Sequence, residues 1–327
     1  MLTALLLTVP ASCLAVTTAA SPTSIPVTLK IPAGILHGTL ERPAGKGPFP
    51  VAIIIAGSGP TDRDGNDVQL GLNTDCYKLL AEALAQHGIA SLRYDKRGAG
   101  EDTLMALPEN KLRFDDYIAD AVAWGKQLRA DRRFSTLTII GHSEGSLIGM
   151  LAAREIPADG YVSLAGAGEP IQNVLLTQLK PKLPPDLYQE SETIVHSLEH
   201  GKTVTAVPAS LNMLFRPSVQ PYLISWFKYD PAKAIAELKI PVLIVQGERD
   251  LQVSVSDAEH LAKADPAAKL VLIPDMNHVL KDVGPSVEAN AASYHNPDLP
   301  LDSTLTAAIR SFILHLHTAE GEHHVHR

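Results

Sequence analysis

Residues 141–145 read GHSEG, and this short segment constrains the chain more than any other part of its sequence. The apolar run 137–140 precedes it and the helix-compatible run 146–151 follows, so a strand is expected to turn sharply into a helix at Ser143. Side chains two residues before and after the serine would collide in so tight a turn, which explains the glycine at both places. The helix start would direct amide N–H groups and a positive dipole end at an oxyanion. Ser143 is therefore the candidate nucleophile.

Two further residues complete a candidate catalytic set. A buried-strand pattern over 240–247 leads into a turn that carries Asp250, and the apolar run 270–274 is followed by His278. Each residue lies just past the C-terminal end of an expected strand, which is where open α/β sheets place their sites. A serine hydroxyl needs a base to become a nucleophile, and the base needs an acceptor on its other nitrogen. The sequence therefore predicts that Ser143, His278 and Asp250 form a catalytic triad.

Two loop motifs carry a resemblance to a known family. Residues 57–66 read GSGPTDRDGN and follow the expected strand 51–56, and residues 93–101 read RYDKRGAGE. With these motifs and the order serine, acid, histidine along the chain, the sequence resembles the α/β-hydrolase superfamily. More narrowly, it is similar to bacterial secreted or periplasmic esterase-like serine hydrolases. The resemblance extends from about Ile25 to about Leu316.

The resemblance implies a fold and two further site residues. The implied fold is an α/β-hydrolase fold, with a mostly parallel eight-stranded sheet, helices on both faces and a helical cap insertion. The implied oxyanion hole consists of two backbone N–H groups, those of Ser58 and Glu144. The resemblance implies no metal and no organic cofactor.

The pattern of apolar residues independently favours an α/β fold. Residues 25–31 and 34–40 alternate polar and apolar side chains, as half-exposed antiparallel strands do. After residue 51, continuous apolar strands alternate with amphipathic helices, which implies a mostly parallel sheet with right-handed crossovers. The expected helices are 77–86 and 115–129, and the expected strands include 89–94 and 161–166.

The alternation stops in the middle of the chain. Residues 169–239 read as helices and loops with many prolines, and we expect them to form a cap between two parts of the core, 24–168 and 240–318. Most apolar residues of this segment are expected to form the cap's own core, and as a group they suggest an apolar pocket for an acyl or alcohol group. Residues 319–327 are expected to be a flexible tail.

The N-terminus resembles an export signal. Residues 2–9 are apolar and residues 18–20 are small, so residues 1–20 are interpreted as a signal peptide of a periplasmic or secreted protein. The alternative is a disordered or weakly anchoring N-terminus. A lipoprotein signal at Cys13 is disfavoured, because Pro10 stands where such a signal has leucine. Removal of the signal would leave Cys76 as the single thiol, so no intrachain disulfide is expected.

Composition narrows the partners. The 327 residues carry a formal net charge of −8 and only 5% are aromatic, which disfavours nucleic acid as a partner. No stretch is expected to form a stable membrane span. The sequence gives no oligomeric state.

Several other polar residues are interpreted as structural. His142 flanks the serine and is expected to pack, and Asp275 stands too close to His278 in sequence to orient its ring. Ion pairs that stabilise their own loops are expected for Asp62, Arg63, Asp64, Asp95 and Arg97. The C-terminal histidines are interpreted as part of the tail rather than as a metal site; they are His315, His317, His323, His324 and His326.

The predicted function is hydrolysis of a small-molecule carboxylic ester through an acyl-enzyme. A serine nucleophile excludes the branches of the superfamily that use aspartate. Peptidase, thioesterase and acyltransferase reactions remain open, because they use the same triad. A non-catalytic binding protein with this fold is the alternative of another class.

Overall fold

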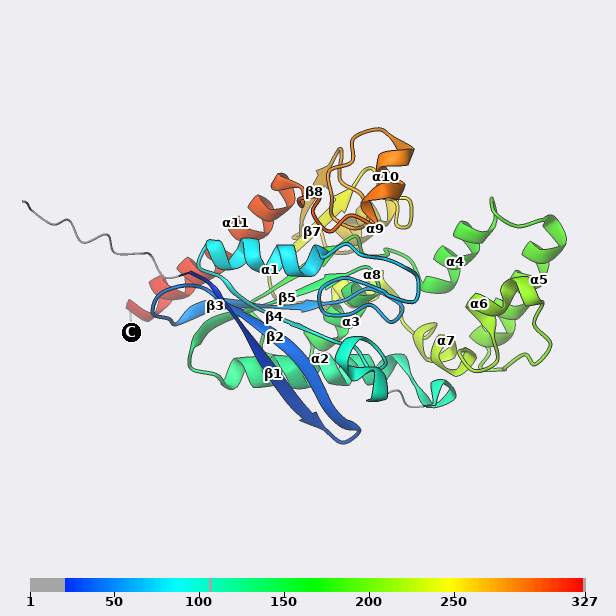
Figure 1. The fold of residues 1–327 in the computed structure, drawn as a ribbon, viewed down its shortest axis with the longest axis horizontal. Helices are drawn as coiled ribbons and strands as arrows, with labels where there is room; N and C mark the ends of the chain where they lie inside the picture. Colours follow the sequence, from blue (N-terminus) through cyan, green and yellow to red (C-terminus); the bar gives the residue numbers. More distant parts are fainter. Residues whose placement is uncertain (1–20, 106–107, 326–327) are drawn as a thin grey trace, which may run out of the picture.

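A computed structural model describes residues 21–105 and 108–325 of the chain. The expected signal peptide, residues 1–20, lies outside the described residues. Within the described ranges the fold is built on one eight-stranded sheet with the strand order β1-β2-β4-β3-β5-β6-β7-β8 (Figure 1). Also within these ranges, none of the helices combines the length and the apolar character needed to cross a membrane.

The sheet is antiparallel at one edge and parallel elsewhere. Strands β1 and β2 form a hairpin, and β2 pairs antiparallel with β4, while every other pairing is parallel. The described strands are β1 Thr23–Ile31, β2 Gly34–Arg42, β3 Phe49–Ile55, β4 Ala90–Tyr94, β5 Phe134–His142, β6 Gly160–Leu164, β7 Val242–Gly247 and β8 Lys269–Ile273. The predicted mostly parallel eight-stranded sheet is confirmed.

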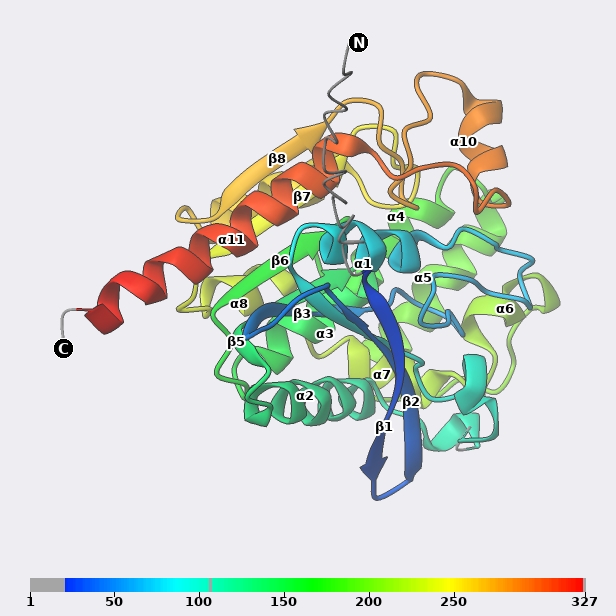
Figure 2. The ribbon, with the colours of Figure 1, turned by 60° about the vertical axis from the view of Figure 1, so that its left-hand side comes forward.

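Helices cover both faces of the sheet, as predicted. Successive strand residues point to opposite faces, so Ile53 and Ile55 join one core cluster and Ala52 and Ile54 join the other. Figures 1 and 2 show α1 and α11 on one face and α2 and α3 on the other. The helices that pack on the sheet are α1 Cys76–Gln86, α2 Phe114–Ala130, α3 Glu144–Ala152, α9 Val255–Ala264 and α11 Ser303–Val325, and α8 Pro231–Ala236 packs against α3 and α9.

Local sequence accounts for these helices. The buried residues of α2 include Phe114, Tyr117, Ala121 and Trp124, whose spacing of three and four places one stripe against the sheet. Helix α9 begins at Ser254, whose hydroxyl accepts the Asp257 N–H in a capping box.

The segment between β6 and β7 forms a lobe beside the end of the sheet (Figure 1). It contains α4 Ile171–Leu179, α5 Pro185–Glu199, the 3₁₀ turn η3 Ala209–Leu211, α6 Asn212–Phe215 and α7 Gln220–Trp226. The ring of Trp226 stacks on Phe114 of α2 with centroids 5.2 Å apart, and the Ser225 hydroxyl accepts the Phe114 N–H at 2.8 Å. Helix α7 therefore anchors the lobe to the core.

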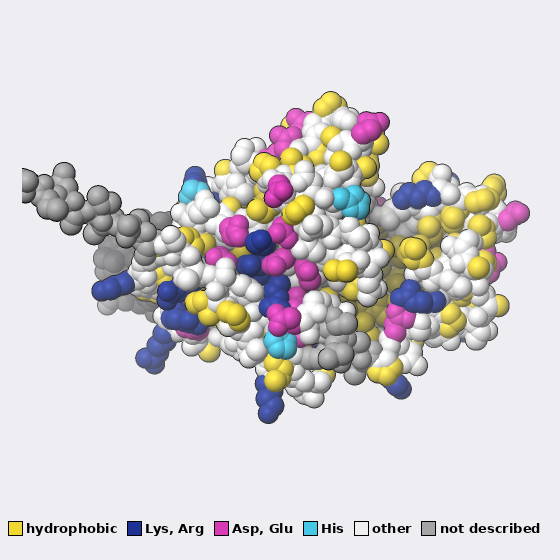
Figure 3. All heavy atoms as spheres, viewed as in Figure 1, with side chains coloured by type: hydrophobic (Ala, Val, Ile, Leu, Met, Phe, Trp, Pro, Cys, Tyr) yellow, Lys and Arg dark blue, Asp and Glu magenta, His cyan; other side chains and the backbone are white. Residues whose placement is uncertain are grey.

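Residues of α5, η3 and α6 form much of the buried interior of this lobe. Ile194 and Leu198 of α5 are buried, as are Leu211 and Phe215 of the following segment. Figure 3 shows a hollow between the lobe and the rest of the molecule, with hydrophobic side chains in its wall. The α4–α7 lobe, which lies within the segment 169–239 expected to form a cap, thus has buried apolar residues and borders an apolar hollow.

The remaining segments lie at the ends of the sheet. They are the 3₁₀ turns η1 Gly100–Met105 and η2 Glu109–Lys111, and helix α10 Val287–Ser293.

Helix α11 continues to Val325 and so includes most of 319–327, the segment expected from sequence to be a flexible tail. Its buried residues Leu305, Ile309, Ile313 and Leu316 recur every three or four positions, which keeps one stripe of the helix on the sheet.

Candidate active site

Ser143 lies between β5 and α3 in a strained backbone conformation. Its φ of 54° and ψ of −121° fall in a region that residues other than glycine rarely adopt. The flanking glycines have a steric cause, because a Cβ on Gly141 would lie 2.2 Å from the Gly145 carbonyl oxygen. A Cβ on Gly145 would lie 2.3 Å from the carbonyl oxygen of Ile55. The sharp turn expected from GHSEG is therefore present.

Asp250 and His278 come together from the turns after β7 and β8. The distance between His278 Nδ1 and Asp250 Oδ2 is 2.7 Å, and both side chains are buried. Burial alone would raise the pKa of Asp250, but the His278 ring and hydrogen bonds from the Gln252 and Val253 amides outweigh it, so the pKa lies below its ordinary value. The ionised carboxylate accepts a hydrogen bond from the Nδ1–H of His278, which leaves Nε2 as the basic nitrogen.

Helix α10 joins the two turns that carry these residues. The Asn277 amide nitrogen donates to Asn290 Oδ1 at 3.0 Å and to the Ser293 hydroxyl at 2.7 Å. The Asn290 amide in turn donates to the carbonyl oxygen of Arg249 at 2.7 Å. Because Arg249 precedes the acid and Asn277 precedes the histidine, these bonds set the position of one turn relative to the other.

His142 connects His278 to the loop after β3. His142 Nε2 lies 2.8 Å from the His278 carbonyl oxygen, which can only accept, so Nε2 carries the proton. Nδ1 then accepts the Tyr77 hydroxyl at 2.7 Å, and the Tyr77 oxygen accepts the Gly57 N–H at 3.0 Å. Burial, with the neighbouring His278, lowers the pKa of His142 to about 3, so the ring stays neutral. His142 thus has the structural role expected for it, and it fills that role through hydrogen bonds. Its partner Tyr77 was not identified from the sequence.

The two residues expected to supply oxyanion N–H groups are Glu144, which directly follows Ser143, and Ser58, in the loop after β3. Glu144 is the first residue of α3, where backbone N–H groups have no partner within the helix. Ser58 follows Gly57, and a Cβ on Gly57 would lie only 3.2 Å from Ser143 Cβ. The loop after β3 therefore approaches the candidate nucleophile closely.

The side chain of Glu144 points into the protein interior. One carboxylate oxygen lies 3.0 Å from Lys96 Nζ, and the other accepts the Tyr222 hydroxyl at 2.9 Å. Lys96 Nζ also donates to the carbonyl oxygen of Gly57. Neither Lys96 nor Tyr222 was singled out from sequence, because no local pattern marks a lysine or tyrosine whose partners are distant along the chain.

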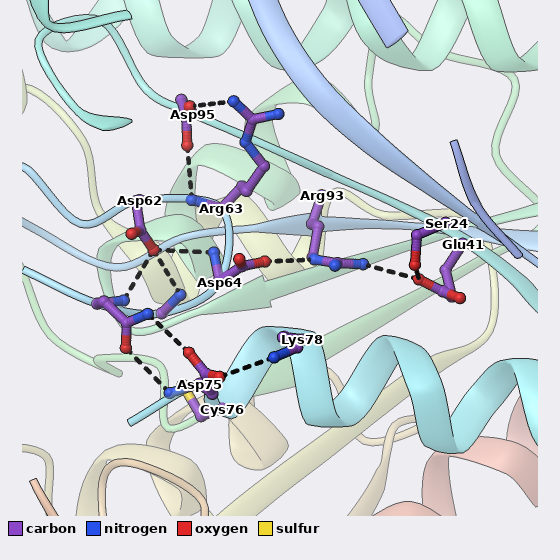
Figure 4. A network of polar contacts seen from close by, with 12 residues as sticks. Ser24, Glu41, Asp62, Arg63, Asp64, Asp75, Cys76, Lys78, Arg93 and Asp95 are labelled. Carbon is purple, nitrogen blue, oxygen red and sulfur yellow. Dashed lines mark hydrogen bonds and ion pairs between the residues drawn. The ribbon is translucent and has the colours of Figure 1, made fainter. Parts of the chain in front are cut away.

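A network of charged side chains stabilises the loop 57–66 (Figure 4). Asp62 Oδ1 accepts the backbone N–H groups of Asp64, Gly65 and Asn66 at 2.9–3.0 Å. The network also includes Arg63 bound to Asp95 at 2.6 Å and Asp64 bound to Arg93 at 2.7 Å. These pairs tie the loop to β4 and to the turn after it, as expected for Arg63, Asp64 and Asp95. The Asp62 carboxylate, for which an ion pair was also expected, instead binds backbone N–H groups of its own loop.

The other residues interpreted as structural have the following positions. Arg97 binds Asp120 of α2 at 2.7 Å, and Asp275 lies 3.6 Å from Arg249 rather than at the His278 ring. His315, His317, His323 and His324 belong to α11, and His326 lies outside the described residues. Among the side chains that the structure describes, those of residues 21–102 and 108–316, no group of three or more His, Cys, Asp or Glu could hold a metal ion.

Comparison with known proteins identifies the family of hydrolases to which the chain belongs. Residues 70–281 match the Hydrolase_4 family model, described as serine aminopeptidase S33. The chain belongs to this family of α/β hydrolases, as the resemblance of its motifs implied.

A curated relative and two solved structures illustrate the family. Esterase EstD of Thermotoga maritima is 31% identical over 250 residues, which are 75% of this chain and 58% of the relative, so the match spans under two thirds of that protein. The structure of Est1E from Butyrivibrio proteoclasticus with ferulic acid bound has a TM-score of 0.59 at 18% identity, covering 89% of this chain and 99% of that one. A dienelactone hydrolase from Anabaena variabilis has a TM-score of 0.54 at 18% identity, with coverage of 90% and 99%.

Proposed function

We propose that this chain is a serine esterase that cleaves small carboxylic esters through an acyl-enzyme, with Ser143, His278 and Asp250 as its triad. The observation that carries the proposal is the buried 2.7 Å contact between His278 Nδ1 and Asp250. The backbone of His278 is in turn hydrogen-bonded to His142, which directly precedes Ser143 and its strained turn. Acyl transfer needs an ionised acid, an oriented base and a serine nucleophile, here at the sharp turn between β5 and α3.

The proposed reaction proceeds in two halves. His278 Nε2 takes the hydroxyl proton of Ser143 while its oxygen attacks the ester carbonyl, and the N–H groups of Ser58 and Glu144 hold the oxyanion. His278 then gives that proton to the leaving alcohol as the C–O bond breaks and the acyl-enzyme forms. A water molecule, deprotonated by His278, then attacks the acyl carbon. As the bond between this carbon and the Ser143 oxygen breaks, His278 returns the proton to that oxygen, which releases the carboxylic acid and restores the serine.

Esters are favoured as substrates by the names of the relatives and by the site. EstD and Est1E are named esterases, and the hollow beside the α4–α7 lobe has hydrophobic side chains in its wall. The family description, serine aminopeptidase, makes a peptidase the second candidate. An aminopeptidase needs an acid for the substrate ammonium, whereas the carboxylate of Glu144 is already bound by Lys96 and Tyr222.

A substrate panel with a serine variant tests the proposal. We expect the wild-type chain to hydrolyse p-nitrophenyl acetate and butyrate faster than aminoacyl p-nitroanilides and acyl thioesters. Ser143→Ala should lower kcat by about six orders of magnitude, by analogy with other triads, whereas Ser256→Ala on α9 should leave it unchanged. Turnover of peptides alone would replace the esterase proposal by the peptidase one.

Labelling of the protein separates an enzyme from a binding protein with this fold. A fluorophosphonate probe should label the wild-type chain at Ser143 and leave Ser143→Ala unlabelled. A folded wild-type chain that does not react would favour the non-catalytic alternative.

Export is part of the proposal and rests on residues 1–20 alone. The apolar run 2–9 and the small residues 18–20 support a cleaved signal and a periplasmic or secreted enzyme. N-terminal sequencing of protein recovered from a periplasmic fraction tests it, and an intact residue 1 on cytoplasmic protein would reject it.

A further inference from the structure

The buried ion pair between Lys96 and Glu144 lies between the two backbone groups proposed to hold the oxyanion. Lys96 is 2% exposed and lies on the turn that follows β4. Because β4 pairs with β3 in the sheet, this turn lies beside the loop after β3. Burying a lysine is costly unless its charge is paired and its N–H groups are bonded, so its partners indicate what it does.

Each partner of Lys96 carries or adjoins one of the proposed oxyanion amides. Its ammonium donates to the Gly57 carbonyl oxygen, and that carbonyl shares a peptide unit with the N–H of Ser58. Its second contact, at 3.0 Å, is to the side chain of Glu144, whose own N–H is the other donor.

The Gly57–Ser58 peptide passes the effect of Lys96 to the N–H of Ser58. A peptide unit is planar, and in the trans form its C=O and N–H point in opposite directions, so fixing the carbonyl of Gly57 also fixes that N–H. A charged donor on the carbonyl polarises the whole unit, which makes the N–H a stronger donor in a site of low dielectric. Lys96 therefore both fixes the direction of the Ser58 N–H and makes it a stronger hydrogen-bond donor.

Other contacts of the group fix the lysine itself. Its ammonium lies 4.9 Å from the centre of the Tyr117 ring, a distance suited to a cation–π contact. The hydroxyl of Tyr222, from α7 of the lobe, binds the second oxygen of Glu144 at 2.9 Å. With these two contacts the ammonium has a defined place between loop and helix.

We propose that Lys96 is a positioning residue of the oxyanion hole: it orients and polarises the Gly57–Ser58 peptide and, through Glu144, holds the start of α3 beside it. The proposal rests on the proposed function, because it assigns Lys96 a role in stabilising the oxyanion of that reaction. Lys96 touches neither the substrate nor the reacting atoms, so its removal should slow the reaction without abolishing it.

The test removes both charges of the pair. Lys96→Met alone would leave Glu144 as a buried unpaired acid and could unfold the chain. The double variant Lys96→Met/Glu144→Gln buries no charge, and the introduced amide oxygen still accepts the Tyr222 hydroxyl. The matched control is the double variant Arg97→Met/Asp120→Asn. It removes both charges of another buried pair, in which Arg97 of the same turn binds Asp120 of α2, and the side-chain bonds of Arg97 are to Asp116 and Asp120 of α2.

Kinetics with p-nitrophenyl butyrate should distinguish a positioning role of Lys96 from a role in the stability of the fold alone. We expect the double variant to keep a cooperative melting transition and to lose kcat by about 10- to 100-fold, with KM changed by less than about threefold. The affinity of an alkyl trifluoromethyl ketone, which forms an oxyanion on the serine, should fall by the same factor as kcat/KM. The control Arg97→Met/Asp120→Asn should keep kcat per folded molecule.

The outcomes that contradict the inference differ from those that contradict the esterase. If the wild-type chain shows Ser143-dependent turnover and the folded double variant keeps kcat within about threefold, the inference alone is overturned. It is also overturned if the loss appears only in KM, or if Arg97→Met/Asp120→Asn loses as much kcat as the Lys96 double variant. A wild-type chain without Ser143-dependent turnover overturns both proposals.

Discussion

The two regions that flank Ser143 are stabilised by different chemistry. The acid–base side, meaning the turns that carry Asp250 and His278, is joined by neutral hydrogen bonds between Asn277 and its partners on α10. The oxyanion side, meaning loop 57–66 and the turn after β4, is held by ion pairs such as those of Lys96 and Arg63.

The difference follows from what each side does in the proposed reaction. A histidine that gains and loses a proton changes its charge in every cycle, so neutral supports keep its position in both states. The oxyanion amides never titrate, so full charges can hold them rigidly before the substrate arrives. We therefore expect variants on the acid–base side to affect chemistry most, and variants at the outer edge of the oxyanion side to affect stability most.

The largest effect in this comparison is expected from Asp250→Asn. An amide in place of the carboxylate can donate to the ring, which favours the wrong tautomer of His278 and should lower kcat by about 10⁴-fold. The matched control is Asp275→Asn, because Asp275 is half exposed and lies near Arg249 rather than the ring. Ester turnover by both variants is the measurement, and equal losses would mean that the acid has been misassigned.

Tyr77→Phe tests the hydrogen bonds that connect the acid–base side to the oxyanion side. It removes the hydroxyl that accepts the Gly57 N–H and donates to His142, and it leaves two buried groups unpaired. An unpaired buried group costs about 1–3 kcal/mol, and part of that loss should appear as a fall in kcat of about tenfold. Tyr188→Phe on α5 is the control. An unchanged kcat in Tyr77→Phe would show that the two sides are positioned independently.

His142 should make the stability of the chain depend on pH. Its pKa is about 3 in the folded chain, against about 6.5 for an ordinary histidine, so between these values only the unfolded chain binds the proton. The stability contributed by the neutral ring is complete above about pH 6.5 and is lost as pH falls towards 3, by up to about 1.4 kcal/mol per pH unit.

Urea unfolding at pH 7 and pH 5 measures this dependence. His142→Gln should show a flatter profile than the wild-type chain, and the exposed control His87→Gln should keep the wild-type slope. Identical slopes in all three proteins would contradict the assignment of a neutral, buried His142.

The smallest effect on turnover is expected from Arg63→Met. Arg63 binds Asp95 and Glu101 at the outer edge of the oxyanion side. After the substitution, Asp95 still accepts hydrogen bonds from the backbone N–H groups of residue 63 and Glu101. The free energy of unfolding should fall by about 1–3 kcal/mol, while kcat stays within about threefold. A loss of kcat as large as that of Tyr77→Phe would show that the outer ion pairs also tune the chemistry.

Much of the fold could be predicted from short patterns. The expected strand 51–56 is observed as Phe49–Ile55, and the expected helix 115–129 is observed as Phe114–Ala130. Such elements are predictable because their periodicity is written in adjacent residues. The extension of α11 through 319–325 was not predicted, because the polar C-terminal end has no apolar stripe to indicate a helix.

The polar partners of the candidate site could not be predicted. Tyr77 and His142 are 65 residues apart, Lys96 and Glu144 are 48 apart, and Tyr222 and Glu144 are 78 apart. Nothing in the residues around a buried lysine or tyrosine says which distant group it will meet. That depends on which strands become neighbours, and β4 precedes β5 along the chain yet pairs with β2 and β3.

The sequence by itself determined the class of fold and the sharp turn at Ser143, because glycine spacing and apolar periodicity act over a few residues. It also pointed to Asp250 and His278, because each follows a strand whose end must lie at the same edge of a parallel sheet. Only the tertiary structure decided that Lys96 meets Gly57 and Glu144, and that His142 joins Tyr77 to His278. Buried polar groups must find partners wherever the sheet order brings them, and that order is a property of the whole chain.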